Sequence, residues 1–163
     1  MAVTTEKSTQ VNNKIATPPV NNPAYDEGGD VKFFYFSFTQ GAAAGDANST
    51  ATLLRMPPGK YRILLDQGNV TCSAFGAART LDLGYTAYTK YDGTAVSASE
   101  DGFISAADIS AAATVATSEA LAAGADRTYL VDSREGFDIV AKCEGGTIPV
   151  GATLKGYILV AGA

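Results

Sequence analysis

The chain has 163 residues, the size of one ordinary domain, and folding at this size buries about 70% of the unfolded surface without needing a disulfide or metal staple. Hydrophobic residues make up 46% and charged residues only 18%, which predicts a globular chain with a bland polar surface. The net charge of -5 and the pI near 4.6 exclude a field that attracts anions. We therefore expect neither nucleic acid nor a membrane among its partners.

Residues 1–29 are polar and poor in large apolar side chains, and we expect an extended N-terminal arm there. The stretch 17–23 (TPPVNNP) cannot continue a helix or a central strand, because proline has no backbone N–H to donate. Two interpretations stay open: a disordered tail, or an arm that becomes ordered across a neighbouring subunit or surface. In the second case the candidate contact residues are Pro18, Pro19, Pro23 and Tyr25. Because residues 1–7 show no apolar secretion signal, we expect the protein to be made and kept in a cytosol.

Residues 31–39 read VKFFYFSFT, and they predict a strand with aromatic side chains on both faces. Phe34, Phe36 and Phe38 would point one way, while Phe33 and Tyr35 would point the other. A strand of a two-layer protein needs only one apolar face, so the second face must be covered by the N-terminal segment, another sheet or another molecule. We take Phe33 and Tyr35 as candidate interface residues.

The next elements predict a meander of short antiparallel strands. A loop over 40–50 leads to a strand over 52–56, and the Pro57-Pro58-Gly59 turn would join it to the next. Strands over 60–66 and 70–75 would flank a turn at 67–69. In 79–91 the alternation predicts one long strand, with Thr80, Asp82, Thr86 and Lys90 in water and a buried face of Leu81, Leu83, Tyr85, Ala87 and Tyr91. Tyr88 is expected on the wet face, which makes it a further candidate interface residue.

Residues 94–127 are rich in Ala, Ser and Thr, and their large apolar residues recur every five or six positions, which keeps no helical stripe. We expect weak strands and loops there, with at most one short helical turn near 105–108. The pattern then predicts a hairpin of strands 129–132 and 137–144 around a turn at 133–136, and a closing strand over 154–160. About eight short strands with Gly and Pro turns indicate a mainly β fold, an antiparallel β-sandwich or jelly-roll-like domain over 30–163.

Side chains that carry chemistry are scarce. The chain has no histidine, no Ser-x-x-Lys motif, and carboxylates at 100–102 and 134–136 that we expect in hydrated turns, so we predict no enzyme activity. The acidic residues lack the spacing of a calcium loop, and we expect no metal or cofactor. Cys72 and Cys143 are expected to be reduced core residues.

Several segments together carry a family resemblance: 54–63 (LRMPPGKYRI), 80–85 (TLDLGY), 92–93 (DG), 101–104 (DGFI) and 151–157 (GATLKGY). Over about residues 31–160 the chain resembles the small decoration, or cement, proteins of tailed bacteriophages. The resemblance implies a β-sandwich that is made in the bacterial host cytoplasm and sits in many copies on the outside of the capsid. There it would bridge neighbouring major capsid proteins and oppose the pressure of packaged DNA, and its partners would be the major capsid protein and its own copies, as a homodimer or homotrimer.

Two alternatives stay open at this point. Another phage component of similar fold, such as a head fibre base or a tail tube or tip protein, would also need surfaces for self-association. A carbohydrate-binding module would use exposed aromatic rings as a stacking platform, although the chain has no tryptophan.

Overall fold

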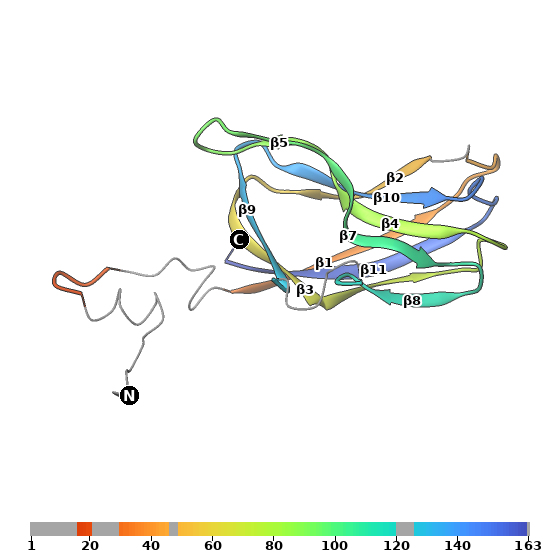
Figure 1. Cartoon of the computed structure of the whole chain (residues 1–163), viewed down its shortest axis with the longest axis horizontal. Coiled ribbons are helices and arrows are strands. Elements are labelled where there is room, and N and C mark those ends of the chain that lie inside the picture. Colours follow the sequence, from red (N-terminus) through yellow and green to blue (C-terminus); the bar gives the residue numbers. More distant parts are fainter. Residues whose placement is uncertain (1–15, 21–29, 46–48, 120–125, 163) are drawn as a thin grey trace, which may run out of the picture.

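The computed structural model describes residues 16–20, 30–45, 49–119 and 126–162. Within these ranges the chain forms eleven β-strands and no helix, and every strand pairing is antiparallel. The fold is an antiparallel β-sandwich, as the sequence predicts. Figure 1 shows its two layers, with β2, β10 and β4 lying over β1, β11 and β3.

One layer is a five-stranded sheet in the order β1-β11-β3-β8, with β9 pairing beside β8 on the same strand β3. Its strands are β1 (Val31–Thr39), β3 (Gly59–Cys72), β8 (Ala113–Ala116), β9 (Thr128–Ser133) and β11 (Thr153–Ala161). The other layer is a four-stranded sheet in the order β2-β10-β4-β7. Its strands are β2 (Thr50–Met56), β4 (Thr80–Tyr85), β7 (Ser99–Asp108) and β10 (Phe137–Glu144). A small hairpin of β5 (Tyr88–Thr89) and β6 (Ala95–Val96) completes the described strands.

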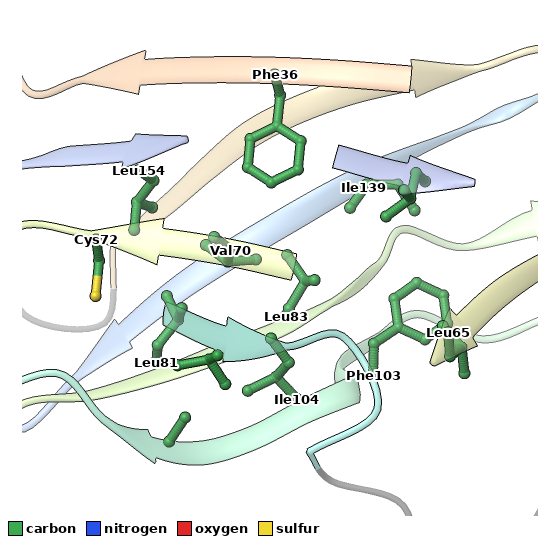
Figure 2. Close-up of a cluster of buried hydrophobic side chains, with 14 of the residues drawn as sticks. Phe36, Leu65, Val70, Cys72, Leu81, Leu83, Phe103, Ile104, Ile139 and Leu154 are labelled. Carbon is green, nitrogen blue, oxygen red and sulfur yellow. The ribbon is translucent and has the colours of Figure 1, made fainter. Parts of the chain in front are cut away.

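The core lies between the two sheets and takes the inward half of each alternating strand. In Figure 2, Phe36, Val70 and Leu154 of the five-stranded sheet face Leu83 and Ile104 of the four-stranded sheet. Cys72 and Cys143 are buried and free, as expected. The inward residues of the predicted strands 137–144 and 154–160 are also buried. Val140, predicted on the outward side, is buried as well, beside a register shift between Ile139 and Val140.

The predicted meander is wrong in two places. Residues 67–69 do not turn the chain back, because β3 continues through them as one strand of 14 residues. Its register on β11 shifts from Leu64 opposite Leu159 to Asn69 opposite Tyr157, so the Gly-containing stretch is a bulge. The turn at Pro57-Pro58 carries the chain from one sheet to the other, since β2 and β3 lie in different layers.

The predicted hairpin of 129–132 and 137–144 has the right strands and the wrong pairing. β9 pairs with β3, whereas β10 pairs with β2 and β4 in the opposite sheet. The turn between them is a corner of the sandwich, and it fits tightly: a Cβ on Gly136 would come 2.3 Å from the carbonyl oxygen of Met56. A short polar turn serves both a hairpin and a sheet-to-sheet corner, so turn length alone does not separate them.

Near 105–108, where the sequence predicts at most one short helical turn, the residues belong to β7. Between the pairs Leu81–Ala107 and Leu83–Ile104, two residues of β7 oppose one of β4. Ala106 takes a positive φ of 52°, which a right-handed helix does not allow, and its N–H donates to Asp82 Oδ1 at 2.7 Å. The buried carboxylate of Asp82 thus stabilises a β-bulge at these residues.

Candidate functional site

The strand β1 shows the two aromatic faces that the sequence predicts. Phe36 is 3% exposed in the core, and Phe34 and Phe38 pack partly buried against it. On the opposite face, Phe33 is 60% and Tyr35 57% exposed, and Val31 adds a third exposed apolar side chain. The described part of the chain therefore leaves the second face of β1 open to solvent.

This open face continues onto the neighbouring strands of the five-stranded sheet. Residues opposite each other in register share a face, so Phe33 lies beside Leu159 and then Leu64. The ring of Phe33 stacks on Tyr157 with centroids 4.8 Å apart. We call this surface the aromatic face, and it comprises Val31, Phe33, Tyr35, Leu64, Tyr157 and Leu159. Leu130 lies on the same outer surface, beyond Arg62, and is not part of this face. Sequence reasoning missed Tyr157 and Leu159, although the outward phase of the predicted strand 154–160 would have found them.

The other half of the same outer surface is polar. Towards the end of β1 the outward residues are Ser37 and Thr39, and their row continues through Lys155 to Thr71. There Thr71 and Thr114 share a hydroxyl hydrogen bond of 3.0 Å. A solvated sheet face normally carries such residues along its whole length, so the apolar half marks the part that is suited to a protein contact.

β1 is also an edge strand. It pairs with β11 on one side, and no other described strand pairs with it on the far side. Its nine residues include one charge, Lys32, whereas natural edge strands are usually blunted by several charges or a proline. The strand thus offers both backbone hydrogen-bonding groups and exposed aromatic rings to a partner.

The remaining predicted contact residues have different outcomes. Pro18 and Pro19 are exposed, whereas Pro23 and Tyr25 lie outside the described residues. The expectation that Tyr88 lies on a wet face is wrong, because it is 7% exposed and stacks on Phe137 with centroids 4.9 Å apart. Its hydroxyl shares a 3.0 Å hydrogen bond with that of Tyr129. A buried Tyr88 is not available as a stacking platform for a sugar or as a surface contact.

The physical reason for the burial of Tyr88 lies just before it in the chain. After β4 the N–H of Thr86 donates to the carbonyl of Asp138, and the strand alternation is broken there. The faces then exchange, so Ala87 and Tyr91, which were expected in the core, are exposed.

A polar pocket of about 400 Å³ lies on the outer side of the four-stranded sheet, lined by Asp82, Ala98, Ser99, Glu100, Asp101, Lys142 and Glu144. Lys142 Nζ bridges Glu100 at 3.2 Å and Glu144 at 3.1 Å. Residues 100–102 lie in β7 and not in the turn expected from the sequence. Asp82, expected in water, is 6% exposed, and burial raises its pKa although the N–H of Ala106 offsets part of the effect.

This pocket holds paired charges. Glu100 and Glu144 bind Lys142, Asp82 accepts from the β7 backbone, and Asp101 accepts from the Ser99 hydroxyl. Among the described residues, no group of three or more His, Cys, Asp or Glu side chains is arranged to hold a metal ion. In the same part of the chain no helix is long and apolar enough to cross a membrane. The aromatic face, with exposed apolar side chains on an edge strand, is therefore the stronger candidate for a functional site.

No protein-family model matches this sequence, and no curated protein matches it either. Among solved structures, the chain is similar to one chain of the cyanophage Pam1 capsid asymmetric unit, with a TM-score of 0.53 and 14% identity. The match covers 87% of this chain and 91% of that chain, so it spans almost the whole of both. The fold is thus a β-sandwich of a type found in a viral capsid.

Two further similarities are lower in score. The structure of infectious bursal disease virus, Gt strain, matches with a TM-score of 0.41 and 12% identity, and covers 83% of this chain and 32% of that chain. The VP2 subviral particle of the same virus matches with a TM-score of 0.33 and 13% identity, and covers 83% and 33%. This chain spans about a third of the length of those proteins.

Proposed function

We propose that this chain is a virion structural protein that decorates a bacteriophage capsid and cements it by bridging neighbouring major capsid proteins. The observation that carries the proposal is the aromatic face, whose exposed Phe33 and Tyr35 lie on an unpaired edge strand. A protein that bridges others needs adhesive surfaces of this kind more than it needs a cleft. The sequence resemblance to phage decoration proteins supports the same role.

The likeness to the cyanophage capsid chain supports the proposal from a second direction. It extends over nearly the full length of both chains, so it concerns a small protein of similar size and not one domain of a large one. Many copies on a particle also make attachment multivalent, so modest contacts per copy suffice for stable binding. We expect these contacts to come from residues 1–29 and from the aromatic face, one for the shell and one for other copies.

The test uses heads of the parent virus purified from a strain that lacks this chain. The purified full-length protein is added, and bound copies per head and the temperature of DNA release are measured. We expect saturable binding at a fixed copy number and release at a higher temperature. A matched variant lacking residues 1–24 should bind at lower occupancy if the arm contributes.

Each outcome has a separate meaning. Absence of binding to the heads contradicts the decoration role. Undiminished occupancy of the truncated chain contradicts the role of the arm and leaves the decoration role in place. Negative-stain images of the protein alone that show free rings or tubes would favour a tail component instead.

A further inference from the structure

The exposed apolar residues of the aromatic face are concentrated at its edge. Val31, Phe33 and Tyr35 are 57–60% exposed, whereas Leu159, Tyr157 and Leu64 on the inner strands are only partly exposed. The surface that needs cover therefore runs along β1 itself. A partner that lies beside β1 in the plane of the sheet would pack its side chains against these three. It would also pair with the backbone groups of Val31, Phe33 and Tyr35, which no described strand pairs with at this edge.

We propose that β1 is the seam of a homodimer, in which it pairs antiparallel with β1 of a second copy and joins the two five-stranded sheets into one. Two identical antiparallel strands are related by a two-fold axis, so each strand presents the complement of the other without any change in sequence. The inference deepens the proposed function, on which it rests for its biological role, by naming the partner at the aromatic face.

The register follows from the positions of the exposed residues. With Phe33 on the two-fold axis, it faces the partner's Phe33, and Val31 faces the partner's Tyr35. Every exposed apolar residue of β1 then opposes another apolar residue, and such cross-strand pairs stabilise a sheet. An axis at Tyr35 would instead oppose Phe33 to the partner's Ser37 and Val31 to the partner's Thr39, which leaves apolar groups against polar ones.

The exposed side chains of β1 supply part of the area that a dimer of ordinary size buries. Three side chains with more than half of their surface exposed present about 350 Å² per copy, against about 800 Å² per partner in a standard interface. The paired backbones and the flanking residues of both edges supply further buried surface. A face-to-face dimer would also bury Leu130, which is 46% exposed on β9 across the sheet and lies away from a β1 seam.

The first experiment measures the mass of the full chain in solution by light scattering and sedimentation. We expect twice the 16.8 kDa of a single chain. Phe33→Lys places two like charges opposite each other on the axis, and we expect dimerisation to weaken by roughly 30-fold or more. Leu130→Lys is the matched control on the same outer surface, and it should leave the dimer intact. Circular dichroism verifies that both variants keep the fold.

Cysteine cross-linking tests the register. Phe33→Cys should give a disulfide-linked dimer on mild oxidation, because opposed residues of an antiparallel pair lie within the Cα separation of a disulfide. Tyr35→Cys should not form this disulfide, because the proposed register places it opposite the partner's Val31. Hydrogen exchange adds a readout that needs no substitution. The amides of Val31, Phe33 and Tyr35 point to the open edge and would pair in this register, so they should be protected at high protein concentration and exchange faster on dilution.

The outcomes separate the two proposals. A single-chain mass at about 100 μM protein overturns the β1 seam. So does a dimer that Leu130→Lys disrupts, or one that Phe33→Lys leaves intact. Cross-linking of Tyr35→Cys but not of Phe33→Cys overturns the register. Measuring occupancy on heads in parallel shows whether decoration holds, because a chain that is monomeric and still binds heads contradicts only the seam.

Discussion

Phe33 and Phe36 provide a matched pair for testing the two faces of β1, because they are the same residue on the same strand with opposite surroundings. Phe36 is 3% exposed and its ring lies over the core side of the sheet, where Gly156 opposite it leaves room for the ring. Phe33 is 60% exposed. Replacing each by alanine removes the same phenyl group, so the difference in stability measures the difference in cover.

The magnitudes follow from the covered area. A phenyl group beyond Cβ carries about 140 Å² of surface, so at about 25 cal/mol per Å² plus a cavity term Phe36→Ala should cost about 3–5 kcal/mol. With about 40% of its surface covered, Phe33→Ala should cost only about 1.4 kcal/mol. For a domain of this size the melting temperature should fall by roughly 10 °C for Phe36→Ala and by roughly 4 °C for Phe33→Ala.

The assay is urea unfolding with thermal melts, run at submicromolar protein concentration so that association does not add to the stability of the parent chain. Equal losses for the two variants would refute the reasoning. That result would mean that Phe33 is covered by its own chain as well as Phe36 is, and the aromatic face would then not be available to any partner.

Three other predictions concern the body of the sandwich. Gly84→Ala should lower stability by about 1–3 kcal/mol in urea unfolding, because its Cβ would lie 1.9 Å from the carbonyl oxygen of Ser99; an unchanged midpoint would contradict the close β4–β7 approach. Burial raises the pKa of Asp82 in the folded chain, so ionising this carboxyl lowers the free energy of unfolding at pH values above that pKa. At low pH the carboxyl is protonated in both the folded and the unfolded chain, and it then costs no stability. Asp82→Asn should therefore be more stable than the parent chain at pH 7, and the difference should vanish towards pH 3. A gain in stability that does not depend on pH would contradict a raised pKa of Asp82. Burial also raises the pKa of the Cys72 and Cys143 thiols, so a chromogenic thiol reagent at pH 8 should label both only after unfolding in urea, and rapid labelling of the native chain would contradict their burial.

Local alternation predicted the strands because successive side chains of a strand point to opposite faces, which gives apolar residues a period of two in the sequence. The strand 31–39 and the inward residues of 137–144 and 154–160 are as expected. The two faces of β1 could also be predicted, since five aromatic residues in six positions must occupy both sides of a strand. The part of the candidate site that depends on a single strand was therefore accessible from the sequence.

Features that depend on the packing of two strands could not be predicted from the sequence. The chain from β9 to β10 crosses between sheets through a turn that also suits a hairpin, so pairing could not be read from it. Tyr88 is buried because the alternation breaks at Thr86, which bonds to a strand more than 50 positions away. Asp82 is buried because β7 bulges over it and supplies an amide. In each case a distant backbone decides the environment, and no local pattern encodes it.

The charge of the chain and the aromatic face fit together in one physical picture. Two copies with a net charge of -5 repel each other weakly at long range, and salt screens this repulsion within about 10 Å at 0.1 M ionic strength. The proposed association between copies must therefore come from short-range apolar contact and backbone pairing, and the described residues combine these two at β1. The rest of the described surface carries acidic, Thr and Ser side chains with separate exposed apolar residues such as Tyr91 and Val150. In the proposed dimer the edge strand would therefore supply the specificity.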